Sequence, residues 1–189
     1  AGNVGATCAE NVARMDICNE VVMVDIKENF AEGNALDQWE ASPVNYFDTR
    51  ITGSTNDYTK TAGSDVVVIT SGIPRKPGMS RDELIGINAG IVKTVTESVV
   101  KHSPEAIIIV VSNPLDVMTY QAYLTANLPH QRVMGMAGIL DTARYRSFLA
   151  MELDVSPKDI QAVLMGGHGD TMAPLPRYTT VAGIPVTEL

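Results

Sequence analysis

Three side chains within residues 141–170 could together bind a carboxylate and move a proton. Asp141 and Arg144 stand three apart in a helical pattern, so they share one helix face. His168 lies among glycines that let a ligand approach its imidazole closely. A carboxylate on one ring nitrogen would fix the tautomer and leave the other nitrogen to exchange a proton with a hydroxyl. Two plainer interpretations remain open: Asp141 as a helix cap and His168 as an exposed loop residue.

Two further arginines, Arg75 and Arg81, belong to a polar stretch with Gly and Pro at its hinges, residues 72–83, which we call the lid loop. The loop follows directly on an apolar strand, at the edge of the sheet where ligands bind. We interpret the arginines as anion clamps on a loop that closes over a substrate and excludes water. The alternative is a solvated loop with surface charges, in which Ser80 caps the next helix.

The first residues could hold a dinucleotide. Gly2 and Gly5 open a helix, and Asp25 follows about 20 residues after Gly5 at the end of a buried strand. Such glycines let the backbone approach a pyrophosphate at the helix N-terminus, while the acid binds a ribose diol and disfavours a 2′-phosphate. The pattern therefore favours NAD over NADP. Asn113 ends another strand, where it either caps the following helix or donates its amide to a substrate oxygen.

These residues need elements that place them, and helical and strand-like segments alternate along the chain. Predicted helices cover residues 5–15, 30–39, 82–102, 115–126 and 141–152. Predicted strands cover residues 21–24, 49–53, 65–71, 107–111, 132–136, 160–164 and 178–181, and the apolar run 66–69 is expected to be covered on both faces. We predict an α/β fold with a doubly wound, Rossmann-like parallel sheet over 1–137 and the start of an α+β substrate domain over 138–189.

The charge and the cysteine content of the chain argue against several classes of partner and site. A net charge of −8 and the absence of a Lys/Arg-rich run argue against a nucleic-acid or anionic-membrane partner. Cys8 and Cys18 have neither zinc spacing nor the count of a disulfide framework, and no metal site is predicted. The chain starts without Met inside a glycine turn that lacks its first glycine and preceding strand. We therefore expect a fragment, truncated at both ends.

Six motifs in order resemble the lactate/malate dehydrogenase family, and more closely its bacterial malate dehydrogenases of the lactate-dehydrogenase-like type. The resemblance covers essentially the whole chain and rests on the stretches 1–5, 24–25, 73–81, 111–116, 140–144 and 166–170. It implies NAD-dependent, reversible oxidation of malate to oxaloacetate in the tricarboxylic acid cycle, by a cytoplasmic homodimer or homotetramer. It also implies that a central first strand precedes Ala1.

The resemblance implies a role for each matching residue. His168 would accept the hydroxyl proton, Asp141 would be its buried partner, and Arg144 would bind the carboxylate beside the reacting carbon. Arg81 would polarise the carbonyl, and Arg75 would pair with the second carboxylate, where the lactate enzymes typically carry glutamine. Residues implied to contact the cofactor are Ala1, Gly2, Asn3, Val4, Gly5, Asp25, Asn88, Val111, Ser112 and Asn113, of which Asn113 would also bind substrate.

Three alternatives stay open. A lactate or other 2-hydroxy acid dehydrogenase would share all of these residues, but Arg75 argues against it. An NAD-dependent glycoside hydrolase would need a divalent metal held by cysteine and histidine, whereas Cys8 and Cys18 lie away from His168 in the sequence. The chain could also be a catalytically silent nucleotide-binding module, which would bind NAD without turnover.

Overall fold

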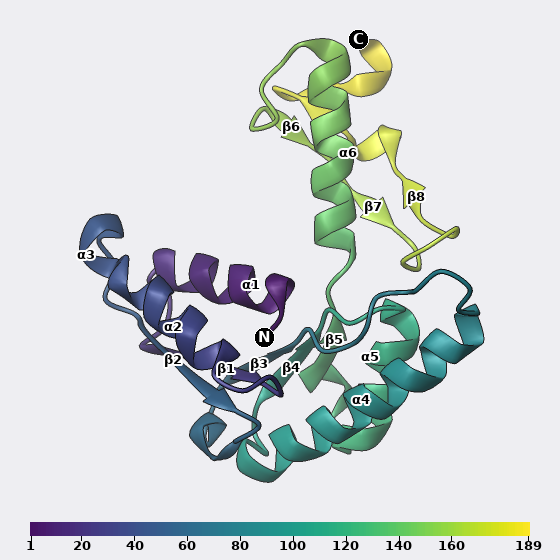
Figure 1. The fold of residues 1–189 in the computed structure, drawn as a ribbon. Helices are drawn as coiled ribbons and strands as arrows, with labels where there is room; N and C mark the ends of the chain where they lie inside the picture. Colours follow the sequence, from purple (N-terminus) through teal and green to yellow (C-terminus); the bar gives the residue numbers. More distant parts are fainter. The chain divides into compact units, whose positions relative to one another are not determined.

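A computed structural model describes residues 1–189, and the chain divides into two compact units, Ala1–Met134 and Gly135–Leu189 (Figure 1). The α-helices are α1 (Asn3–Arg14), α2 (Phe30–Glu40), α3 (Ser42–Asn45), α4 (Arg81–His102), α5 (Leu115–Ala126) and α6 (Gly138–Leu153). The strands are β1 (Glu20–Asp25), β2 (Arg50–Thr55), β3 (Val66–Ile69), β4 (Ile107–Val110), β5 (Val133–Gly135), β6 (Ile160–Gln161), β7 (Leu164–Met165), β8 (Ala173–Pro174), β9 (Thr180–Val181) and β10 (Ile184–Pro185).

Parallel strands in the first unit confirm the predicted α/β class. β1 and β2 form one parallel pair, in register from Glu20 opposite Arg50 to Asp25 opposite Thr55. β3, β4 and β5 form a second sheet in that order, with β3 parallel to β4. The sheet is thus divided between β1 and β3, and each of these two strands is paired along one side only.

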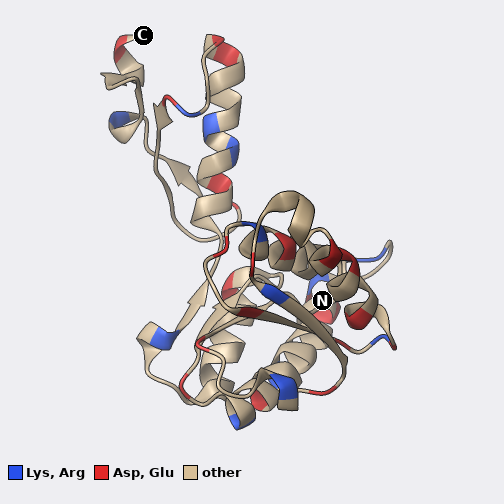
Figure 2. Ribbon diagram, turned by 90° about the vertical axis from the view of Figure 1, so that its left-hand side faces the viewer, with Lys and Arg blue, Asp and Glu red and all other residues tan.

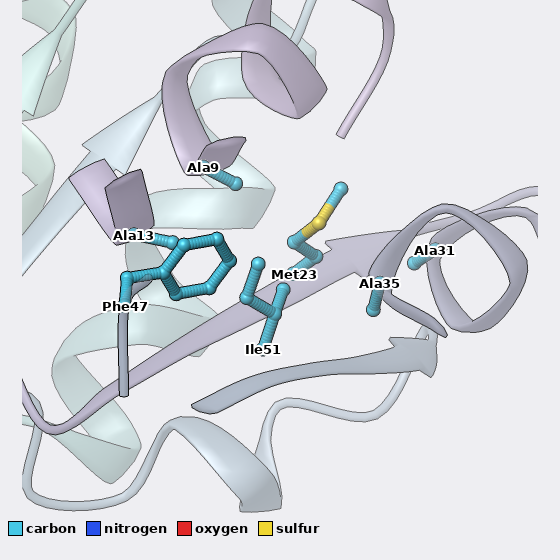
Figure 3. Close-up of a cluster of buried hydrophobic side chains, with 7 residues drawn as sticks. All are labelled: Ala9, Ala13, Met23, Ala31, Ala35, Phe47 and Ile51. Carbon is cyan, nitrogen blue, oxygen red and sulfur yellow. The ribbon is translucent and has the colours of Figure 1, made fainter. Parts of the chain in front are cut away.

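Small residues bring the helices close to the β1–β2 pair. The core of this layer joins α1, β1, α2 and β2, and Figure 3 shows its side chains meeting between helices and strands: Ala9, Ala13, Met23, Ala31, Ala35, Phe47 and Ile51. Four of the seven are alanines, all from the two helices, so the helix backbones can lie near the strands while Met23, Phe47 and Ile51 fill the space between. This packing holds the N-terminus of α1 near the end of β1.

The expectation that the run 66–69 is covered on both faces is wrong. Val66 is 50% exposed and Val68 is 38% exposed, whereas Ile69 is buried. Because side chains alternate along a strand, Val66 and Val68 point to the face of β3 opposite to that of Ile69. The first unit leaves that face open. An apolar run therefore indicated a strand correctly without indicating how many of its faces are covered.

The second unit differs from its prediction in three places. Of the predicted strand over 178–181, only Thr180–Val181 forms a strand, because Tyr178 ends a short 3-10 helix, Pro176–Tyr178. α6 begins at Gly138, three residues before the predicted start at Asp141. The predicted strand over 160–164 is two strands, β6 and β7, which belong to different small sheets: β6 pairs with β9, and β7 pairs with β8, both antiparallel. Its core contains Ala150, Ile160 and Val181. Short strands of two residues carry too few side chains for their alternation to be read from sequence.

Charged side chains are spread over both units, with Lys and Arg dispersed among the more numerous acidic residues (Figure 2). None of the helices combines the length and apolar character needed to cross a bilayer.

Candidate active site

The second unit contains a histidine–carboxylate pair. His168 Nδ1 lies 2.8 Å from Asp141 Oδ2, and Asp141 is 4% exposed while the His168 side chain is 26% exposed. A buried carboxylate held this close to one ring nitrogen fixes the orientation of the imidazole, which leaves Nε2 as the nitrogen able to exchange a proton. The sequence-based pairing of Asp141 with His168 thus corresponds to a contact in the structure.

A hairpin brings His168 to the helix that carries Asp141. The β7 residue Leu164 donates its backbone N–H to Thr142 Oγ1 of α6 at 3.1 Å, so the strand is tied beside Asp141. Gly166 then turns the chain at a φ of +101°, and a Cβ at this position would lie 2.2 Å from the carbonyl oxygen of Thr171. Only glycine fits this turn. Thr142 was missed as a supporting residue, although it stands within the motif 140–144.

Arg144 lies on the same side of α6 as Asp141. Its Nη1 is 3.4 Å from Asp141 Oδ1, and 56% of its side chain is exposed. The guanidinium can therefore still present donors to a carboxylate while one edge stays near Asp141. Asp141 does not cap the helix, because Ala137 is the N-cap residue and makes no side-chain cap bond. The plainer interpretation of Asp141 is wrong.

In the first unit, the N-terminus of α1 has the features of an anion site. Gly2 is the N-cap residue, Asn3 and Val4 are exposed, and the first turn has no acidic residue. A Cβ on Gly5 would lie 2.8 Å from Thr70 Oγ1, beyond the end of β3, so a larger residue would push the helix away from the strand. A helix start with no side-chain cap, no acidic residue in its first turn and a close approach to the strand suits a pyrophosphate.

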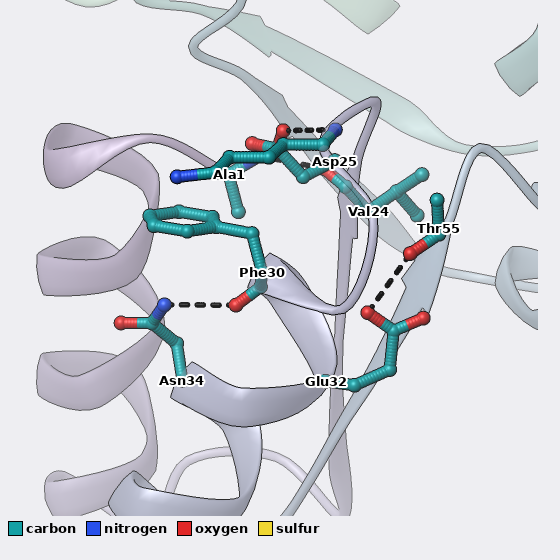
Figure 4. Close-up of polar contacts among 8 residues, drawn as sticks. Ala1, Val24, Asp25, Phe30, Glu32, Asn34 and Thr55 are labelled. Carbon is teal, nitrogen blue, oxygen red and sulfur yellow. Dashed lines mark hydrogen bonds and ion pairs between the residues drawn. The ribbon is translucent and has the colours of Figure 1, made fainter.

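Asp25 ends β1 beside this helix start. Its Oδ2 lies 2.7 Å from the Ala1 nitrogen (Figure 4), and its Oδ1 accepts from the Lys27 N–H at 2.9 Å. Burial raises the pKa of the Asp25 carboxyl, and the hydrogen bond from the Lys27 N–H lowers it. An ionised acid at this position can accept bonds from a ribose diol and would repel a 2′-phosphate.

Two residues near Asp25 were missed in the sequence. Thr55, opposite Asp25 in the β1–β2 register, donates to Glu32 Oε2 at 3.0 Å (Figure 4) and accepts the Asn29 N–H at 3.0 Å. These bonds tie the turn after β1 and the first turn of α2 to the end of β2. Burial and then the negative charge of Asp25 raise the pKa of the Tyr58 hydroxyl, so Tyr58 lies within electrostatic reach of that acid. Neither contact had a motif to reveal it.

The lid loop keeps its arginines in solvent. Arg75 is exposed and its Nε donates to the carbonyl of Met79, within the same loop, at 3.0 Å. Ser80 caps α4 in a capping box with Glu83, as the plainer interpretation expected, and Arg81 begins the helix as an exposed residue. Capping does not exclude the clamp, because the cap uses Ser80 and leaves both guanidinium groups available.

The loop after β4 is held by its backbone and by Ser112, whose hydroxyl donates to the carbonyl of Ser71 at 2.5 Å. Asn113 is exposed and does not cap α5, since Pro114 is the N-cap residue. Asn88 is buried, and its amide bonds to the backbone of Ile73 and Asn113. The structure therefore groups Asp141, His168 and Arg144 in the second unit, and Asn88 with the Asn113 loop in the first.

Comparison with known proteins agrees with this geometry. Residues 1–135 match the family domain described as lactate/malate dehydrogenase, NAD binding domain, and residues 139–189 match the lactate/malate dehydrogenase, alpha/beta C-terminal domain. Malate dehydrogenase of Cytophaga hutchinsonii is 70% identical over 189 residues, which are 100% of this chain and 61% of that protein.

Solved structures of malate and lactate dehydrogenases also align with the chain. Malate dehydrogenase from Salinibacter ruber aligns with a TM-score of 0.93 at 62% identity, covering 100% of this chain and 59% of that one. Lactate dehydrogenase from Cryptosporidium parvum, complexed with lactic acid and the nicotinamide cofactor, aligns with a TM-score of 0.91 at 38% identity, covering 99% of this chain and 58% of that one. The chain spans less than two thirds of the length of these relatives.

Proposed function

We propose, since the chain belongs to the lactate/malate dehydrogenase family, that it carries out NAD-dependent, reversible oxidation of malate to oxaloacetate. In this proposal residues 1–137 bind NAD and residues 138–189 contribute to the substrate and catalytic domain. The contact that carries the proposal is the 2.8 Å pair between His168 Nδ1 and buried Asp141 Oδ2. Such a pair suits a reaction in which one proton leaves a hydroxyl as the carbon is oxidised.

His168 and Asp141 act as the proton relay. With Nδ1–H donated to Asp141, Nε2 accepts the proton of the malate C2 hydroxyl, and the carboxylate stabilises the imidazolium that forms. In the reverse direction the same nitrogen returns the proton to the carbonyl oxygen of oxaloacetate. In both directions Asp141 orients the imidazole and does not receive its proton.

Each of the three arginines binds a different group of the substrate. Arg144 binds the carboxylate next to the reacting carbon through a bidentate fork, and Arg81 polarises the carbonyl oxygen. Arg75 pairs with the second carboxylate, which requires it to leave the Met79 carbonyl that it bonds at 3.0 Å. An unpaired, desolvated guanidinium facing a methyl group would be costly, so Arg75 also rejects pyruvate. Asn113 would donate to the substrate oxygen and bind the nicotinamide region of the cofactor.

NAD supplies the hydride acceptor, and the described residues fit it. The α1 start, from Ala1 to Gly5, would hold the pyrophosphate on exposed N–H groups. Asp25 would bind the adenine ribose, while Val111, Ser112 and Asn113 would line the nicotinamide end, with Asn88 behind them. Ionised Asp25 favours NAD over NADP because it repels a 2′-phosphate.

We extend the proposal to a cytoplasmic homodimer or homotetramer in the tricarboxylic acid cycle. Leu36 and Trp39 on α2 are exposed while Ala31 and Ala35 on the same helix are buried, so α2 has an apolar surface for a second copy. Light scattering of the purified protein tests this, and a monomer at micromolar concentration would contradict it.

Steady-state NADH oxidation with oxaloacetate beside pyruvate tests the function. We expect a kcat/KM for oxaloacetate that exceeds the value for pyruvate by at least roughly a hundredfold, since pyruvate leaves Arg75 unpaired. A preference for pyruvate would instead support the 2-hydroxy acid alternative. NADH binding without turnover of either acid would support the silent module.

A further inference from the structure

Asn88 occupies an unusual position for a polar side chain. It is 2% exposed, on the face of α4 that also buries Val92, Thr96 and Val99. Its side-chain amide is engaged three times with the backbone. Oδ1 accepts the Ile73 N–H at 2.9 Å, and Nδ2 donates to the Ile73 carbonyl at 3.2 Å and to the Asn113 carbonyl at 2.7 Å. Both donors are used, and Oδ1 keeps one free lone pair.

These bonds join two segments that are far apart in the sequence. Ile73 stands at the start of the lid loop, two residues before Arg75, and Asn113 follows β4. Because Asn88 bonds both the N–H and the carbonyl of Ile73, it sets the orientation of that peptide segment as well as its position. The third bond holds the Asn113 carbonyl, while the Asn113 side chain stays exposed.

Gly72 allows this arrangement. A Cβ at Gly72 would lie 3.2 to 3.3 Å from three atoms of the Asn88 amide, and the residue has a φ of +149°. A side chain here would press on the amide and strain the backbone at once. The absence of a side chain at Gly72 thus leaves the space that the Asn88 amide fills.

We infer that Asn88 is a positioning residue that anchors the fixed end of the lid loop to the Asn113 loop. This inference rests on the proposed function and changes the role implied for Asn88 by resemblance. A direct cofactor contact through Nδ2 would have to break a buried hydrogen bond, which is unfavourable. Asn88 acts instead through Ile73 and Asn113. Because Ile73 is held, the lid loop moves only beyond it, and Arg75 moves from a fixed point. Because the Asn113 carbonyl is held, the Asn113 side chain faces the substrate from a fixed position.

Hydrogen–deuterium exchange and kinetics on the full chain separate these roles. In Asn88→Ala we expect the Ile73 N–H to exchange roughly tenfold faster because its acceptor is lost. We expect kcat for oxaloacetate to fall roughly 10- to 100-fold through misplaced groups, and the Kd for NADH to change by less than about twofold. Thr96→Val is the matched control: Thr96 is buried on the same helix face and its hydroxyl has no hydrogen-bond partner, so neither readout should move.

Asn88→Asp covers the case in which the alanine variant does not fold. The carboxylate keeps an acceptor for the Ile73 N–H but loses the donors to the Ile73 and Asn113 carbonyls, so protection of the Ile73 N–H should stay while kcat falls. A weakened NADH Kd with unchanged Ile73 exchange and unchanged kcat at saturating NADH would overturn the inference. Faster Ile73 exchange in Asn88→Ala, in a protein that never turns over oxaloacetate, would support the anchor and refute the proposed function.

Discussion

Replacing Asp141 by Asn removes the charge that supports the proposed proton acceptor and keeps the size of the side chain. Asp141 Oδ2 lies 2.8 Å from His168 Nδ1, and the acid is 4% exposed, so little solvent screens the pair. With charge centres roughly 4 Å apart and an effective dielectric constant near 20, the carboxylate stabilises the imidazolium by about 4 kcal/mol. That energy corresponds to roughly a thousandfold in kcat/KM for malate oxidation.

The assay is initial-rate NADH formation at saturating NAD, with NADH affinity measured separately by fluorescence. Asp154→Asn is the matched control, because Asp154 is an exposed residue at the other end of α6 whose left-handed conformation, with a φ of +51°, also suits asparagine. It should keep wild-type kcat/KM. If Asp141→Asn kept more than about a tenth of wild-type kcat/KM, the relay would be wrong, because that loss is far below the Coulombic term.

Three further outcomes follow from individual residues. Arg75→Gln should move preference toward pyruvate, since it removes the charge that pairs with a second carboxylate; oxaloacetate turnover that survives unchanged would remove Arg75 from the substrate site. Gly90→Ala should raise the free energy of unfolding by up to ~1 kcal/mol in urea denaturation, because Gly90 lies within α4 and a Cβ there meets nothing within 4 Å. Hydrogen bonds from the Thr49 hydroxyl and N–H, and from the Asp48 N–H, lower the pKa of Asp16. Its stabilising effect is therefore full above the unfolded-state value of ~3.9 and is lost as pH falls toward the folded pKa. Asp16→Asn should flatten acid unfolding in that range, and an unchanged acid transition would contradict this.

The sequence-based predictions were most accurate where interactions between residues close in the sequence decide the structure. The Ser80–Glu83 capping box set the start of α4, and its apolar periodicity matched a helix that runs to His102. The Asp141–Arg144 spacing placed both residues on one face because three residues in a helix nearly complete a turn. The pair with His168 was reachable because the glycines mark a turn in which an imidazole can face a ligand.

The sequence-based predictions failed where contacts between residues far apart in the sequence decide the structure. Val66 and Val68 belong to an apolar run, yet whether a face of β3 is covered depends on other segments. The three backbone bonds of Asn88 depend on Ile73 and Asn113, which stand 15 and 25 positions away, and no pattern of residue types records them. The division of 160–164 between two small sheets likewise depends on partners as distant as β8 and β9.

The proposed reaction transfers a hydride directly from C2 of malate to NAD, while His168 takes the hydroxyl proton. Malate carrying deuterium at C2 tests it, with the NADH formed analysed by proton NMR. If the hydride is transferred directly, the deuterium is retained at C4 of the nicotinamide and none enters the solvent. NADH without deuterium, or no NADH at all from malate, would contradict it.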